Sequence, residues 1–158
     1  MIVTHDIFAE TNPAFCASVL ASFCDAHFSV KGNLPSMIIA YAVLPVVLSN
    51  DLASTFLHCN KNTGLLMWLH RNPIVLTDLA KRINGTLSIS TNAIRFGCIM
   101  NILKLESDGF LSCAGYVAPK YKVDNDTISS YKRARLLGNW FATAGSSRTI
   151  VEALGVWL

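Results

Sequence analysis

Apolar residues recur at helical spacing along most of the chain. After Asn12-Pro13, the aromatic and aliphatic side chains Phe15, Val19 and Phe23 follow one another every four residues. Asn is a favourable N-cap and Pro suits the first helical position, so a helix is predicted to begin here and to end near Gly32.

The next 40 residues predict shorter helices separated by proline and polar signals. Ser36 is expected to cap a helix over 37–44, which Pro45 kinks or ends before the apolar residues 46–48. A short helix or loop follows over 51–58. Asn62-Thr63 is expected to cap a helix over 64–71, which Asn72-Pro73 stops.

Residues 73–118 predict a helix–turn–helix followed by a hairpin. A short helix is predicted over 73–83, with its apolar residues Ile74, Leu76, Leu79 and Ile83 facing inward. The tight turn Asn84-Gly85 follows. Ser90-Thr91 is expected to cap a second helix over 92–105, with an apolar stripe of Ile94, Cys98, Ile102 and Leu105. A turn at 107–109 then leads into a hairpin over 110–117, and this order is typical of a winged helix.

The last segment, after a linker over 119–126, predicts two amphipathic helices joined by a Gly-Ser turn. Gly145 is expected to stop the first helix, and Thr149 with Glu152 forms a capping-box signal for the second, which ends at Gly155. The fold class is therefore mainly α: a compact helical domain with a winged-helix-like element and a C-terminal helical hairpin. One domain is expected over 1–158, divided into N-terminal helices (1–72), the winged-helix-like core (73–118) and the hairpin (119–158).

The order of residues in this hairpin is distinctive. From Arg135 onward it reads R-x-L-G-x-W-F-x-x-A-G-x-x-x-T-I-x-x-x-L-G-V. This pattern resembles the middle component of bacterial three-component ABC systems, the class to which Lamassu-type defence systems belong. Weaker likenesses lie at Asn12-Pro13-Ala14-Phe15, Leu44-Pro45, residues 66–69, Asn72-Pro73 and residues 79–82.

The resemblance implies a cytoplasmic adaptor in anti-phage or anti-plasmid defence. Its partners would be an SMC/RecN-like ABC ATPase and an effector, expected to be a nuclease, and DNA would be reached indirectly through the complex. The family pattern carries no catalytic residue and no cofactor over to this chain.

Composition supports a protein with much of its surface covered by a partner. Of the 158 residues, 52% are apolar and 15% are charged, against about 25% charged in an average domain. A compact helical core with few surface positions is the alternative explanation. The uncharged run 34–48 is too short to cross a bilayer of about 30 Å, and residues 1–10 lack the pattern of a signal peptide. The five cysteines include no C-x-x-C pair and are expected to be reduced, mostly buried thiols.

The densest basic cluster is Lys132, Arg133 and Arg135, in a chain that is mildly acidic through residue 60 and mildly basic afterwards. The cluster is a candidate to bind an acidic groove of a partner or DNA phosphates, or it is a solvated helix face. Arg135 is expected to pair with a partner carboxylate. Trp140 and Phe141 are candidates for partner contact, although core positions are the more common fate of such residues.

Weaker nucleic-acid candidates accompany the predicted winged helix; they are Lys81, Arg82, Arg95 and Lys104, with Asn92 and Asn101. The helix over 92–105 also carries Phe96, Ile99 and Met100 outside its core stripe. An all-round apolar helix is expected to be buried, which favours protein docking over DNA reading.

No sequence pattern points to catalysis. A hydrolase needs a nucleophile, a base and a group that orients the base, and the few histidines have no fixed acidic neighbour. The adjacent pair His58-Cys59 is a poor metal-ligand set, and glycine-rich phosphate loops are absent from the sequence. A winged-helix DNA-binding transcriptional regulator and a small membrane-associated protein remain the alternatives.

Overall fold

The computed structural model describes residues 12–115 and 125–156, with side chains in the last long helix described from Ser130 onward. Residues 1–10, which lack the pattern of a signal peptide, lie outside the described residues, as do the end of the expected hairpin (116–117) and most of the expected linker (119–124). The described chain is mainly helical, with one small antiparallel sheet. This confirms the predicted fold class at that level.

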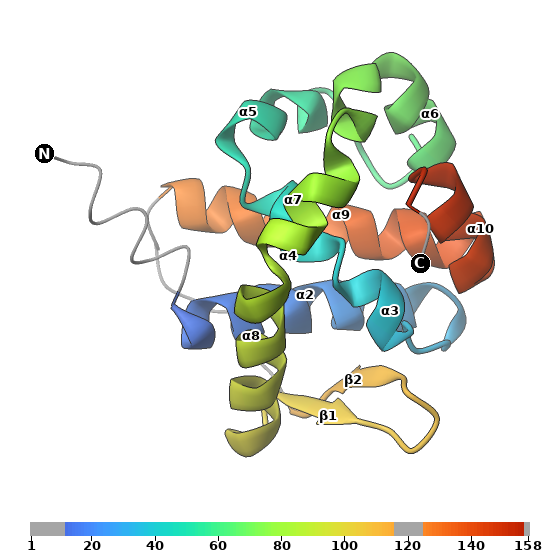
Figure 1. Ribbon diagram of the computed structural model, residues 1–158. Helices are drawn as coiled ribbons and strands as arrows, with labels where there is room; N and C mark the ends of the chain where they lie inside the picture. Colours follow the sequence, from blue (N-terminus) through green and yellow to red (C-terminus); the bar gives the residue numbers. More distant parts are fainter. Residues whose placement is uncertain (1–11, 116–124, 157–158) are drawn as a thin grey trace, which may run out of the picture.

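Two long helices form the centre of the molecule. Helix α2 (Pro13–Lys31) lies against α9 (Asn125–Ala144) over most of its length (Figure 1). The backbones approach closely at Gly138, where a Cβ would lie 2.5 Å from the carbonyl oxygen of Phe23. The predicted limits of α2 are confirmed, since Asn12 accepts hydrogen bonds from the first turn and Gly32 adopts a left-handed conformation with φ 72°.

Short helices follow α2 in the chain: α3 (Met37–Ala40), α4 (Val43–Val47), α5 (Asn50–Ala53), the 3-10 turn η1 (Ser54–Phe56) and α6 (Leu65–Arg71). Of these, α4 and α6 lie against α9. An aromatic cluster joins them to α9: Trp140 packs against Phe56 and Trp68, with ring centroids 5.9 and 5.2 Å apart. The Trp140 Nε1–H donates to the Asn60 carbonyl at 3.0 Å.

The other side of α2 is covered by α8 (Leu87–Ile99) and a hairpin of β1 (Leu103–Leu105) and β2 (Leu111–Cys113), as Figure 1 shows. Helix α7 (Leu79–Gly85) precedes α8, after the 3-10 turn η2 (Pro73–Leu76). The Met37 N–H donates to the Gly109 carbonyl at 2.9 Å, which ties the hairpin turn to the start of α3.

Several predicted helix limits were wrong. The helix expected over 37–44 breaks at Tyr41-Ala42, and Pro45 lies in the first turn of α4, where a missing N–H breaks no helical bond. The helix expected over 73–83 is divided at Asp78, which has φ 57°. Ile74 and Leu76 are therefore exposed, and Val75 is the buried residue of that turn.

The predicted second helix of the helix–turn–helix was also placed too late. Helix α8 begins at Leu87, and Asn84-Gly85 are the last two residues of α7, so Thr86 alone separates the two helices. It ends because Asn101 adopts φ 56° and the Ile102 N–H donates back to the Gly97 carbonyl at 2.8 Å. Residues 103–105, expected to be helical, form β1.

Two predicted caps belong to other residues. The N-cap of α6 is Gly64, with φ 78° and no side-chain hydrogen bond to the first turn. Helix α10 (Ser147–Ala153) is capped by Ser146, whose Oγ accepts from the Thr149 N–H at 3.2 Å, three residues before the expected cap. Glu152 pairs with Arg148 one turn earlier in the same helix.

Among the described residues, α2 is long and apolar enough to match a membrane span by length and composition. It lies between α9 on one side and α8 with β2 on the other, and a little over half of its most apolar stretch is buried inside the fold. The bent pair formed by residues 37–47 and 50–56 turns by 93°, and its first arm lies within the uncharged run 34–48 noted in the sequence.

Candidate partner-binding surfaces

The basic cluster of α9 is divided between three environments. Lys132 is exposed. Arg133 is half-buried, with its Nε–H donating to the Val47 carbonyl at 2.9 Å at the end of α4. Arg135 lies against α2, where its Nη1 is 2.9 Å from an Asp25 carboxylate oxygen. The three cations therefore do not form one continuous basic patch.

The Arg135–Asp25 pair gives Arg135 a role within the chain. Both side chains are about half exposed, at 44% and 53%, so water screens the attraction and the pair contributes little to stability. Asp25 and Arg135 are far apart in sequence, and no local pattern identifies this partner. Any carboxylate from another protein would have to share Arg135 with Asp25.

Trp140 and Phe141 lie in the hydrophobic core. Both side chains are essentially inaccessible to solvent, and Phe141 meets Phe23 of α2 in an edge-to-face arrangement at 5.7 Å. Of the two positions considered from the sequence, partner contact or hydrophobic core, the structure supports the core for both residues. Their packing fixes the position of α9 in the helical hairpin.

The four weak nucleic-acid candidates are also dispersed. Arg82 is held by Asp51, with Nη1 3.1 Å from Oδ1, and by the Ser49 hydroxyl at 3.2 Å. Hydrogen bonding from Arg82 lowers the pKa of Asp51. Lys104 lies 3.5 Å from Glu106 in the hairpin. Lys81 on α7 and Arg95 on α8 are exposed, and the described residues give neither of them an ion pair.

The expectation that the second helix is buried on every face was wrong. One side of α8 packs against α2 through Ala93 and Ile94, but the opposite side exposes Asn92 and Arg95. At its end, Ile99 is 77% and Met100 57% exposed. The apolar residues outside the core stripe thus form exposed surface, because the hairpin turns back toward α2 and leaves the end of α8 uncovered.

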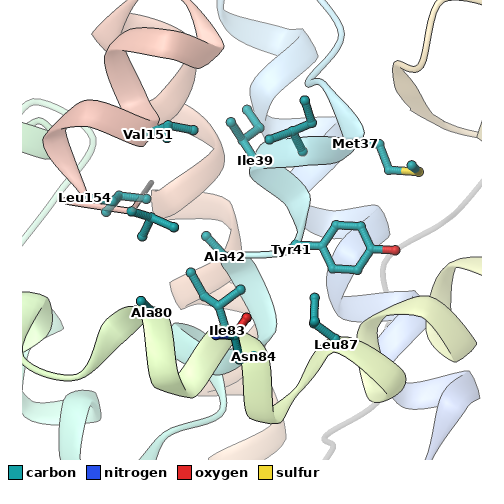
Figure 2. Close-up of a pocket in the computed structure, with 12 residues that line it drawn as sticks. Met37, Ile39, Tyr41, Ala42, Ala80, Ile83, Asn84, Leu87, Val151 and Leu154 are labelled. Atoms are coloured by element: carbon teal, nitrogen blue, oxygen red, sulfur yellow. The ribbon is translucent and has the colours of Figure 1, made fainter. Parts of the chain in front are cut away.

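An apolar groove lies between α3, the α7–α8 corner and α10 (Figure 2). Ile39 and Tyr41 come from the α3 side, Ile83 from α7, and Val151 and Leu154 from α10. The cavity holds about 280 Å³, room for a few aliphatic side chains. The Tyr41 hydroxyl lies 2.9 Å from the Thr91 hydroxyl and fixes one end of the groove. The groove unites four remote segments, so no local sequence pattern revealed it.

A more polar cleft of about 560 Å³ lies on the other side of α3, next to His27. The ring Nδ1 of His27 lies 2.8 Å from the Asn33 carbonyl, so Nδ1 carries the proton and donates. Burial lowers the pKa of His27, which keeps the ring neutral at neutral pH.

The cysteines are the candidate nucleophiles among the described residues. The five cysteines are free thiols; Cys16 and Cys24 are buried and the other three half-buried. Burial raises the pKa of the Cys24 thiol, which makes it a poor nucleophile. In the described part of the chain, no three His, Cys, Asp or Glu residues lie together in a way that would hold a metal ion. What this surface offers is apolar and cationic contact area.

Comparison with known proteins gives one finding. The family model described as ABC-three component (ABC-3C) system Middle Component 3 matches residues 2–158. No curated protein and no solved structure matches the chain.

Proposed function

The chain belongs to the middle component 3 family of ABC-three component systems, and from this premise we propose that it is a non-catalytic adaptor subunit. The observation that carries the proposal is the extent of the family match, which includes almost every residue. In this role the chain joins the ABC ATPase of its system to the effector. The ATPase is of the SMC/RecN-like class, the effector is a nuclease, and the complex acts in the cytoplasm in Lamassu-type anti-phage or anti-plasmid defence.

The exposed apolar surface supports an adaptor. Large apolar side chains stand out from several elements, among them Leu57 (66% exposed), Leu66 (69%) and Ile99 (77%). The apolar groove of Figure 2 adds further surface of the same kind. Contiguous apolar surface such as the lining of this groove marks sites where proteins associate.

In this proposal the C-terminal hairpin and the winged-helix-like segment have different roles. The hairpin holds Lys132, Arg133 and Arg135 in place through the buried anchors Trp140 and Phe141. Residues 73–118 act as a winged-helix-like docking element, and the succession of α7, α8 and the β1–β2 hairpin along the chain supports this. The surface that this element presents is the exposed side of α8.

Reconstitution of the three components tests the adaptor role. The ATPase is tagged and purified after co-expression with the effector, with and without this chain. We expect the effector to be recovered in amounts comparable to the ATPase only when this chain is present. Recovery of the effector in its absence would refute bridging. Hydrolysis of nucleotide or DNA by the purified chain alone would refute the non-catalytic role.

The alternative is a winged-helix DNA-binding regulator, and the exposed polar side of α8 is the observation that favours it. Asn92 and Arg95 lie on this side, where they can reach adenine and guanine in a major groove. A binding selection from random duplexes separates the two functions. An adaptor is expected to give weak, sequence-independent binding that falls steeply with salt. A sharp consensus lost in Arg95→Ala would establish the regulator instead.

A further inference from the structure

The small sheet has one open edge, which belongs to β1. Strand β2 is held on its other side by the segment before α3: the Leu111 N–H donates to the Pro35 carbonyl at 2.9 Å, and Phe110 forms a bridge with Ser36. Figure 1 accordingly shows β1 as the outer strand, with β2 nearer to α2 and α3. The edge of a strand is a template on which a further strand can pair.

The hydrogen bonds of the β-hairpin show which backbone groups of β1 face outward. The Ala114 N–H donates to the Ile102 carbonyl at 3.0 Å, and the Glu106 N–H donates to the Phe110 carbonyl at 2.8 Å. Bonded and non-bonded pairs alternate along antiparallel strands, so Leu105, one residue before the bonded Glu106, directs its N–H and C=O away from β2. Neither group has a hydrogen-bond partner within the part of the chain that the structure describes.

The side chains at this edge carry a symmetrical pattern of charge. Leu105 is 48% exposed. Lys104 and Glu106 flank it and share the opposite face of the strand, because successive side chains of a strand alternate. Their charged groups lie 3.5 Å apart, with the lysine side chain 66% and the glutamate side chain 34% exposed. The remaining charge of the β-hairpin, on Asp108, lies in the turn beyond these residues.

This order of charges is complementary to itself. When two β1 strands pair antiparallel about a two-fold axis at Leu105, the two leucines exchange both outward hydrogen bonds, and each Lys104 lies opposite Glu106 of the other copy. Opposite charges directly across two strands stabilise the pair. An axis at Lys104 would place two lysines opposite each other, which is destabilising. An axis at Leu103 would place Leu105 opposite Asn101, whose φ of 56° is not that of a strand.

From this geometry we infer that β1 is a self-association edge, at which two copies of this chain join their β-hairpins into one four-stranded antiparallel sheet. Because β1 is short, the contact is smaller than a standard protein interface, and it depends on each charge and each outward backbone group. An extended segment of another protein would gain the same backbone bonds without needing this order of charges. The inference goes beyond the adaptor function and does not rest on it.

The test uses charge reversal in cells that express two full-length copies at low level, each fused to one half of a split luciferase. Lys104→Glu gives an edge with two carboxylates, and Glu106→Lys gives an edge with two ammonium groups. Either variant paired with itself therefore places like charges opposite each other, whereas the two variants paired together restore two opposite-charge pairs. The matched control is Arg148→Glu, which reverses a cation of another exposed ion pair, on α10.

We expect luminescence at matched protein levels to fall at least about tenfold when either variant is paired with itself. The mixed pair and the Arg148→Glu control are expected to lie within about threefold of wild type. Leu105→Pro removes the outward N–H but no ladder bond, so it is expected to reduce the signal more than Leu105→Ala, which keeps that N–H.

Three results would overturn the inference. Wild-type copies that give no more signal than an unrelated fusion would mean that Lys104 protects the edge from pairing, which is a common use of lysine on edge strands. Undiminished signal in the self-paired variants, or an equal loss in the control, would mean that association does not depend on β1. A mixed pair as weak as the self-paired variants would mean that the strands do not meet in this register. None of these results bears on the adaptor function, because no other component of the system is present.

Discussion

Gly138 is the residue at which the packing of the two central helices is most directly testable. An added Cβ would lie 2.5 Å from the Phe23 carbonyl oxygen and 3.0 Å from both the Ala26 Cβ and the His27 nitrogen. Ordinary carbon contacts begin at about 3.5 Å. Because two of these three atoms belong to the backbone of α2, no rotamer change can relieve the clash. In Gly138→Ala, α2 and α9 must move apart by roughly 1 Å, as judged from that contact distance.

Two opposing effects determine the size of the change. Overpacking a well-packed core costs about 1–3 kcal/mol, while replacing Gly by Ala within a helix contributes about 1 kcal/mol of stability. We expect the cost to lie at its upper limit, since the clash is with backbone, and therefore a net loss of about 2 kcal/mol. For a chain of this size that corresponds to a fall in melting temperature of roughly 4–8 °C.

Gly85 provides a matched control, because the same substitution is expected to have the opposite sign there. Gly85 ends α7, and nothing lies within 4 Å of an added Cβ. Gly85→Ala is expected to change the free energy of unfolding by between zero and about 1 kcal/mol in the stabilising direction. Thermal and urea unfolding followed by circular dichroism measures both variants. A Gly138→Ala variant as stable as wild type would refute the close helix contact.

Three further outcomes are expected. Trp140→Ala removes a fully buried ring and its hydrogen bond to the Asn60 carbonyl, and it is expected to lower the free energy of unfolding by about 3–5 kcal/mol. Arg135→Ala breaks an exposed ion pair, and in the same urea titration it is expected to lower the free energy of unfolding by less than about 1 kcal/mol. If Arg135→Ala destabilises as much as Trp140→Ala, the pair with Asp25 is stronger than its exposure implies. Burial lowers the pKa of His27 in the folded chain, so the unfolded chain binds more protons and the free energy of unfolding is expected to fall as pH drops below the ordinary histidine pKa of about 6.5. His27→Gln, which keeps a side-chain donor for the Asn33 carbonyl, should reduce that slope in urea titrations at pH 7.5 and 5.5, and an identical slope would assign it to other groups. The chain expressed alone is expected to elute as aggregates in size-exclusion chromatography, because its exposed apolar side chains are numerous and its charged residues are few. Co-expression with the ABC ATPase is expected to restore a soluble species. A monodisperse monomer that is unaffected by the ATPase would contradict this prediction.

The residues of the chain determined those features that depend on near neighbours. Asn12-Pro13 and Gly32 fix the limits of α2, because a cap side chain and a left-handed glycine act within one turn of the helix. The same holds for Gly145 and Gly155 beside α10, both with positive φ. The burial of Trp140 and Phe141 follows from their size and from the apolar positions around them. Asn101 was a missed local signal, since asparagine is the residue other than glycine that most readily ends a helix in this way.

Apart from the local stop at Asn101, tertiary packing decided where the helices between residues 37 and 105 divide, and it decided which residues meet. The break at Asp78 lets α7 reach α4, and the strand at 103–105 forms where the hairpin turns back to cover α2 together with α8; helical periodicity does not record such turns. The pairing of Arg135 with Asp25, and the placement of Lys132 beside Leu57, join positions more than 70 residues apart. Charge and hydrophobicity identify the residues that can bind, but only the packing of α9 against α2 and η1 determines which of them share a surface, because that packing sets both their distance and their exposure to water.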